Sequence, residues 1–217
     1  MSGRPVDAAL PTAVRVWLGP GAVLAALVVA AVGIRYADRD RPGAVDSWLR
    51  PSEPGARSPW RHAALAADFL GEPVGAAALV LAAVTGCLLL RRPRAAVLVV
   101  AGAGLAVATT RLLKHVVGRT IHGGNLSYPS GHTAFLTALA LSVALLVAGR
   151  FGLGGAVATL LVLGAALIAG AAMGWAQVAL GAHYPTDALG GWCTALAVTP
   201  AAGWLIDRTA DARRPGR

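Results

Sequence analysis

Two short segments of the chain, about fifty residues apart, each place a histidine beside a long apolar run: YPSGH at 128–132 and GAHYPTD at 181–187. An ionisable group in such surroundings is costly, so a functional role is the first hypothesis. Asp187 follows His183 by four residues. Its carboxylate can bind one ring nitrogen and leave the other free to attack an electrophilic centre such as phosphorus. With His132 as the proton donor and acceptor, the segments predict one buried polar site.

A third polar segment and a helix start could supply an anion-binding pocket. Lys114 and Arg119 stand at the end of another apolar run and bring positive charge. Ser130 precedes a predicted helix, whose first backbone amides, at Gly131 and His132, can bind an anion. Glycine at this point allows the anion to approach the backbone closely. These residues fit the charge stabilisation that transfer of a phosphoryl group requires.

The composition indicates which elements must position these residues. The chain has 217 residues, of which 56% are hydrophobic and 13% charged, and its mean hydropathy is +0.64. Such a chain cannot make an ordinary soluble surface, and we expect an all-α integral membrane bundle. Because a span needs about 20 mostly apolar residues, the sequence predicts about six. They cover approximately residues 16–34, 72–90, 95–117, 131–148, 156–175 and 187–206.

We expect a single membrane-embedded domain over residues 1–217, with a motif core at 114–187. No repeat of 20 to 50 residues is present, so a solenoid or an inverted-repeat transporter is not indicated. The connections have distinct characters. They are a polar loop at 35–61 with a short interfacial helix near residues 46–48, a lead-in turn at 62–69, a glycine-rich loop at 118–129, a turn at 150–155 and an arginine-rich tail at 207–217.

The net charge of +9 is interpreted in the same membrane setting. Arginines lie between apolar runs and in the tail, where lipid headgroups are the nearest anions, so we expect membrane lipids and no nucleic acid as partners. Alternation of six spans puts the termini, residues 91–94 and Arg150 on one face, whose arginine excess predicts the cytoplasm. The site then faces the non-cytoplasmic side of a multi-pass cell-membrane protein. Cys87 and Cys193 lie inside apolar runs and are expected to be packing thiols.

The motifs resemble those of the type 2 phosphatidic acid phosphatase superfamily, which is related to vanadium haloperoxidases. The family pattern is Lys, six residues, Arg-Pro; then Pro-Ser-Gly-His; then Ser-Arg, five residues, His, three residues, Asp. The second block is complete at residues 129–132. The third block keeps His183 and Asp187 at the family spacing. The resemblance covers residues 114–187 by motif and the other spans by topology.

The sequence departs from this pattern at two expected phosphate ligands. Lys114 is present, but Ile121 and His122 replace the Arg-Pro pair, and Ala176 and Gln177 replace the Ser-Arg pair. Arg119 matches an additional arginine of many relatives and could take over one role. Gln177 can donate hydrogen bonds to a phosphoryl oxygen but carries no charge, and an interhelical polar contact is an equally good interpretation.

The resemblance implies a membrane hydrolase that removes phosphate from a lipid phosphate or a polyprenyl (di)phosphate through a phosphohistidine, without metal or cofactor. His183 would be the nucleophile, Asp187 its orienting group and His132 the acid and base. The implied substrate ligands are Lys114, Arg119, Ser130, Gly131 and Gln177.

Three questions stay open at this stage. One alternative to hydrolysis is a phosphotransferase, and another is a catalytically retired protein that binds a lipid phosphate or a partner. Asp68 and Glu72 either line the mouth of the site or are solvated acids at a helix start. The sequence makes no prediction of oligomeric state.

Overall fold

The computed structural model describes residues 8–49 and 59–213, and within these ranges the chain folds into eight helices and one short hairpin. Residues 1–7, 50–58 and 214–217, which include part of the predicted polar loop, part of the tail and some arginines of the topology argument, lie outside the described residues. The helices are α1 (Thr12–Tyr36), α2 (Ala44–Leu49), α3 (Trp60–Phe69), α4 (Pro73–Leu89), α5 (Pro93–Val117), α6 (Gly131–Arg150), α7 (Gly155–Ala179) and α8 (Pro185–Ala212). The hairpin strands are β1 (Thr120–Ile121) and β2 (Asn125–Leu126). The predicted all-α fold is confirmed.

Five helices, α1, α5, α6, α7 and α8, are long and apolar enough to cross a membrane. Helices α3 and α4 pass the same test together, although they are bent by 63° at a short break between them. Counted as one broken span, this pair gives six spans, as the sequence predicted. The protein is therefore a multi-pass membrane protein.

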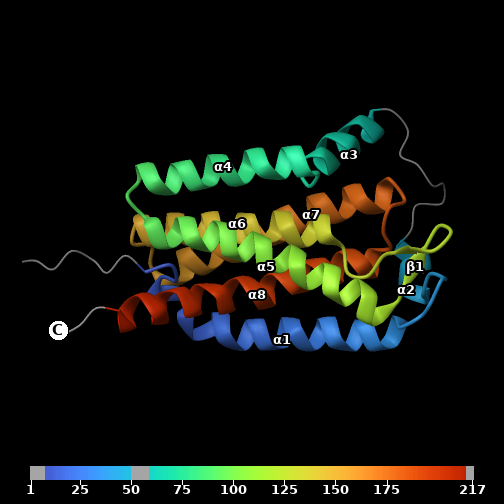
Figure 1. Cartoon of the computed structure of the whole chain (residues 1–217), viewed down its shortest axis with the longest axis horizontal. Helices are drawn as coiled ribbons and strands as arrows, with labels where there is room; N and C mark the ends of the chain where they lie inside the picture. The colour runs from blue at the N-terminus through green and yellow to red at the C-terminus, as the bar shows by residue number, and fades with distance from the viewer. Residues whose placement is uncertain (1–7, 50–58, 214–217) are drawn as a thin grey trace, which may run out of the picture.

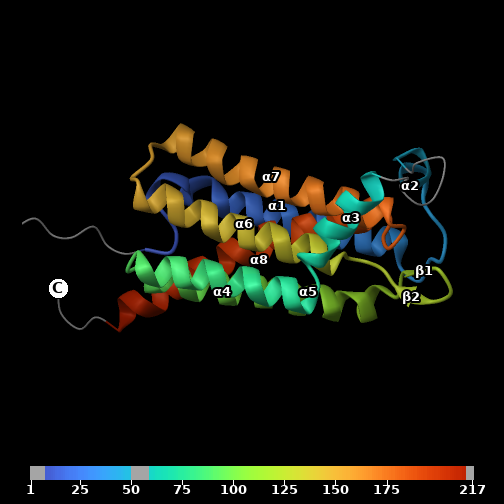
Figure 2. The same cartoon turned by 90° about the horizontal axis from the view of Figure 1, so that it is seen from above.

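Helix α8 runs through the middle of the bundle and packs against α1, α5, α6 and α7 (Figures 1 and 2). Helix α4 lies against α5, and α3 crosses to α7. The largest apolar cluster joins α1, α5, α6, α7 and α8 through fully buried side chains such as Leu98, Leu141 and Val162. The two cysteines, Cys87 and Cys193, are buried and free, as predicted.

Two connections differ from the prediction. The expected lead-in turn at 62–69 belongs to the ten-residue helix α3. The glycine-rich loop contains the β1–β2 hairpin, in which Thr120 pairs with Leu126. Three consecutive residues at its tip, His122, Gly123 and Gly124, have positive φ angles. The two glycines make this tight reversal possible, because they adopt positive φ without steric cost.

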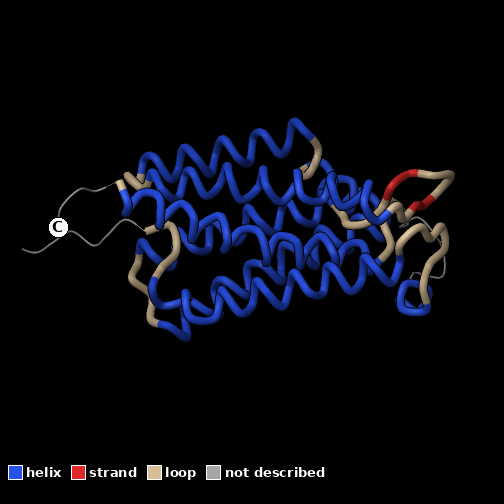
Figure 3. The backbone as a smooth tube through the Cα atoms, turned by 60° about the horizontal axis from the view of Figure 1, so that its bottom comes forward, coloured by secondary structure: helices blue, strands red, loops and turns tan. Residues whose placement is uncertain are grey.

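The two ends of the bundle have different polar clusters. At one end, the buried carboxylate of Asp207 accepts hydrogen bonds from the amides of Ala9 and Leu10 and pairs with Arg15 and Arg94. This cluster ties the first described residues to α5 and α8. At the opposite end, on the right of Figures 1 and 3, α2, the hairpin and the α7–α8 turn come together. The histidine segments belong to this second end.

Candidate active site

The two histidine segments are joined directly through their backbones. The amide of Ser130 donates a hydrogen bond to the carbonyl of Asp187 over 2.9 Å. A Cβ at Gly191 would lie 2.3 Å from the carbonyl oxygen of Ser130, so α8 approaches the start of α6 at a distance that only glycine allows. The chain thus brings the YPSGH and GAHYPTD segments together, although they are about fifty residues apart.

His183 lies in the turn between α7 and α8. The amides of Ala182 and His183 both donate to the carbonyl of Gln177, and Gly181 has a φ of 76°, which ends α7 and reverses the chain. The imidazole is 8% exposed, and its Nδ1 lies 3.6 Å from Oδ2 of Asp187. Burial lowers the pKa of His183 from its ordinary 6.5, and the charges of Lys114 and His132 lower it further against the opposing effect of Asp187. His183 is therefore a neutral imidazole at pH 7, and Lys114 and His132 lie within electrostatic range of it.

Asp187 is fully buried at the first turn of α8, which begins at Pro185. Its Oδ2 accepts a hydrogen bond from the amide of Tyr184, and its Oδ1 pairs with Nη1 of Arg119 at 2.6 Å. The carboxylate is thus fixed on one side by the helix start and on the other by a guanidinium. It faces His183 with a rigid orientation.

Arg119 is fully buried behind Asp187. Its Nη2 pairs with Asp46 at 2.6 Å, and its guanidinium lies between two aromatic rings, 4.2 Å from the centroid of Tyr36 and 4.5 Å from that of Tyr184. Arg119 was expected to bind phosphate. Its two Nη atoms contact carboxylates, and its Nε is buried without a hydrogen-bond partner among the described residues. A role of Arg119 in phosphate binding stays a prediction.

Asp46 is a site residue that the sequence analysis did not identify. It comes from the short helix α2 and is fully buried, and it accepts hydrogen bonds from Gly43, from Arg119 and from both the amide and the hydroxyl of Thr186. Burial alone would raise the pKa of Asp46, but these hydrogen bonds outweigh it and hold the pKa below 3.8. The available signal was weak: one acid beside apolar residues within a charged loop.

His132 is surrounded by acids from the bend between α3 and α4. Its Nε2 lies 3.6 Å from Oδ1 of Asp68 and 3.5 Å from Oε1 of Glu72. The ring packs against the backbone of Gly71, where a Cβ would lie 2.1 Å from its Cδ2. Of the two interpretations left open for these acids, the structure supports a position in the site.

Three further predicted ligands, Lys114, Ser130 and Gly131, lie at the end of α5 and the start of α6. Lys114 is half-buried, and its Nζ donates to the carbonyl of Leu126, while its charge acts on His183. Ser130 is fully buried and caps α6, accepting hydrogen bonds from the amide and the hydroxyl of Thr133. Gly131 is the first residue of that helix.

The side-chain amide of Gln177 is hydrogen-bonded to a residue of another helix. It is 1% exposed, and its Nε2 donates to Oδ1 of Asp68 over 2.6 Å. The interhelical polar contact is therefore present and joins α7 to α3, and a role of Gln177 in binding phosphate stays a prediction.

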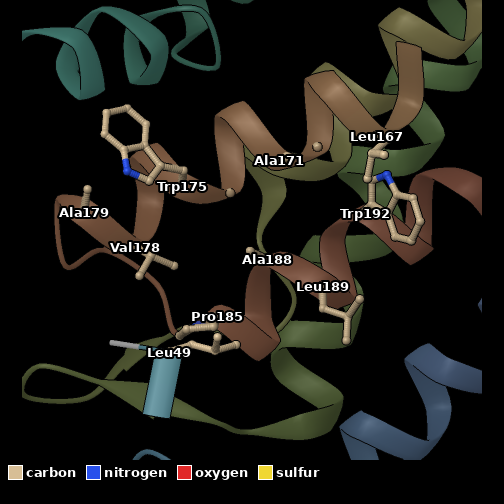
Figure 4. Close-up of a pocket in the computed structure, with 12 residues that line it drawn as sticks. Leu49, Leu167, Ala171, Trp175, Val178, Ala179, Pro185, Ala188, Leu189 and Trp192 are labelled. Carbon is tan, nitrogen blue, oxygen red and sulfur yellow. The ribbon is translucent and has the colours of Figure 1, made fainter. Parts of the chain in front are cut away.

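An apolar groove begins beside the α7–α8 turn (Figure 4). It has a volume of about 430 Å³. Trp175 and Trp192 flank it, and Leu49 and Pro185 lie side by side at one end (Figure 4). Pro185 is two residues from both His183 and Asp187. The groove thus runs along α7 and α8 from the polar end toward the apolar middle of the bundle.

These features define a helical membrane protein with a two-histidine polar site at one end of its bundle. Residues 115–209 match the PAP2 superfamily. No curated protein matches the chain at a significant level. In structure, the chain is similar to a transmembrane PAP2 type phosphatidylglycerolphosphate phosphatase from Bacillus subtilis, with a TM-score of 0.65 and 19% sequence identity, over 90% of this chain and 98% of the other. The predicted resemblance to the PAP2 superfamily is confirmed, and the chain has the fold of a membrane PAP2 phosphatase.

Proposed function

We propose that this protein hydrolyses a lipid phosphate through a phosphohistidine on His183. One observation carries the proposal: a neutral, buried imidazole faces the fixed carboxylate of Asp187 at 3.6 Å, within electrostatic range of His132 and Lys114. A neutral imidazole has a free lone pair for attack on phosphorus, and the carboxylate stabilises the positive charge of the resulting phosphohistidine.

The steps of the reaction divide among these side chains. Lys114 and the amide at the start of α6 stabilise negative charge on the phosphoryl oxygens. His183 attacks phosphorus as the bond to the leaving oxygen breaks, and His132 gives that oxygen its proton. His132 then takes a proton from water, which attacks the phosphohistidine and releases phosphate and free His183. None of these covalent steps uses a metal ion.

A lipid is the substrate class that the surroundings favour. Pro185, which is two residues from His183 in the chain, lines one end of the apolar groove of Figure 4. The groove could receive a hydrocarbon tail. Polyprenyl phosphates or diphosphates, phosphatidate-type lipids and phosphatidylglycerolphosphate, the lipid in the name of the Bacillus subtilis protein, all have such a tail. In the predicted topology, the site faces the non-cytoplasmic side of the membrane.

Purified full-length protein in detergent, offered these lipid phosphates and a soluble short-chain phosphate ester, tests the proposal. We expect phosphate release from at least one lipid, slower release from the soluble ester and no release by His183→Gln. Binding without turnover by the unaltered protein would support a retired site instead. Phosphorylation of an added lipid or sugar acceptor in place of phosphate release would support a phosphotransferase.

A further inference from the structure

The bend between α3 and α4 places beside His132 two carboxylates that the proposed reaction does not use. Asp68 lies in the last turn of α3, Glu72 precedes α4, and both side chains face His132 at the start of α6. One carboxylate oxygen from each acid and Nε2 of His132 all lie within 4.8 Å of one another. These are three oxygen and nitrogen ligands of the kinds that divalent metal ions prefer.

The two distances to Nε2 of His132 fit metal coordination better than hydrogen bonding. The carboxylate oxygens are 3.5 and 3.6 Å from Nε2 of His132, whereas N–H···O hydrogen bonds are about 2.7–3.2 Å long. Around a tetrahedral Zn²⁺ with bonds of about 2.0–2.1 Å, neighbouring ligand atoms are about 3.3–3.5 Å apart. The Nε2 atom is also buried and has no hydrogen-bond partner within residues 8–49 and 59–213. A metal ion would satisfy this nitrogen.

The charges of the site favour a cation at this point. Among the described residues of the site, two cations, Lys114 and Arg119, accompany four carboxylates. The formal charge is therefore −2 when both histidines are neutral. Asp46 and Asp187 already share the guanidinium of Arg119. Asp68 and Glu72 thus carry the uncompensated charge.

The surrounding contacts hold two of the three ligands, Asp68 and His132, in place. Gln177 donates a hydrogen bond to Asp68, in the manner of the outer hydrogen bonds that orient metal ligands. Gly71 leaves no space for the His132 ring to shift toward the backbone of the bend.

We propose that Asp68, Glu72 and His132 bind a divalent cation of the Zn²⁺ class, with three protein ligands and a fourth position open to solvent or to a phosphoryl oxygen. A metal on Nε2 takes the lone pair that would otherwise accept a proton, so the ring can no longer form the imidazolium. Given the proposed function above, in which that imidazolium is the acid, the cation inhibits the enzyme. Binding of the cation itself does not depend on that function.

Direct titration with Co²⁺ tests the site without measuring activity. Metal-stripped full-length protein, free of a polyhistidine tag, is titrated while the visible absorption of Co²⁺ is recorded, and Zn²⁺ is then added as competitor. We expect one ion per chain and displacement by Zn²⁺. Asp68→Asn and Glu72→Gln preserve side-chain volume, and each should weaken binding more than about 10-fold, because loss of an outer-sphere partner already costs about 10–100-fold.

Asp40→Asn is the matched control, because the Asp40 side chain is 79% exposed on the loop between α1 and α2; this variant should bind like the unaltered protein. Absence of saturable binding, or binding that survives both ligand variants, would overturn the proposal. The second readout is Zn²⁺ inhibition of lipid phosphate hydrolysis, which should be lost in Asp68→Asn and kept in Asp40→Asn. If Co²⁺ binds as expected but no lipid phosphate is hydrolysed, the metal site stands and the proposed function fails.

Discussion

The buried pairing of Arg119 with Asp46 and Asp187 predicts a large and non-additive loss of stability when the arginine is removed. In Arg119→Gln, two carboxylates that are fully buried lose their guanidinium partner. Removal of one partner from a buried ion pair costs about 3–5 kcal/mol, since the remaining charge stays buried without compensation. We expect the free energy of unfolding to fall by at least this amount, with a further contribution from the lost stacking on Tyr36 and Tyr184.

A double-mutant cycle with Asp46→Asn isolates the electrostatic contribution. Asp46→Asn alone removes one charged partner and leaves Arg119 paired with Asp187, so it should cost about 1.5–3 kcal/mol. In the double variant one of the two unpaired carboxylates is absent. The combined cost should therefore be smaller than the sum of the single costs by about 1–3 kcal/mol.

Unfolding of the detergent-solubilised protein by SDS, followed by tryptophan fluorescence, provides the free energies. Asp40→Asn again serves as the control and should change the free energy of unfolding by less than about 0.5 kcal/mol. A cost below about 1 kcal/mol for Arg119→Gln, or additivity of the two substitutions, would refute the idea that Arg119 neutralises a buried carboxylate pair.

Three further predictions concern the site itself. Burial lowers the pKa of His183, and the neutral ring is the nucleophile. The value of kcat/KM should therefore begin to fall on the acid side only below pH 6.5. A fall that begins at or above pH 6.5 would contradict this assignment. Gly71→Ala should displace the ring of His132 and lower kcat about 100-fold or more, while Gly164→Ala, where nothing lies within 4 Å of the added Cβ, should retain activity; equal rates for the two variants would argue against His132 as the acid. In Gln177→Arg, the new guanidinium should pair with Asp68, which Gln177 now contacts, and weaken Co²⁺ binding more than about 10-fold. Unchanged Co²⁺ affinity would show that Asp68 is not a metal ligand.

The spans and the approach of the motif segments could be predicted from the sequence for simple physical reasons. A run of about 20 apolar residues has few structures available in a membrane other than a helix. Alternation of six such helices then puts the ends at residues 118–130 and 180–187 on one face. Pro185 suits the start of α8, because proline is well suited to the first helical turn.

The partners of the buried side chains could not be predicted in this way. Asp46 meets Arg119 across 73 positions of sequence. The short helix near residues 46–48 could be predicted, but nothing in it indicates which partner Asp46 binds. The contact of Asp68 with His132 depends on the 63° bend between α3 and α4, which no residue type specifies. The charge of Arg119 was visible in the sequence, whereas its pairing with Asp46 and Asp187 was not.

Detection of the covalent intermediate tests the central claim most directly. Full-length protein carrying His132→Ala, mixed with an aryl phosphate whose leaving group needs little protonation, should form the intermediate but hydrolyse it slowly. After rapid denaturation at alkaline pH, mass spectrometry of peptides should find an acid-labile phosphate on His183, and none when His183→Gln is added. Phosphate on a different residue, or phosphate release by the unaltered protein without any phosphorylated peptide, would contradict the account.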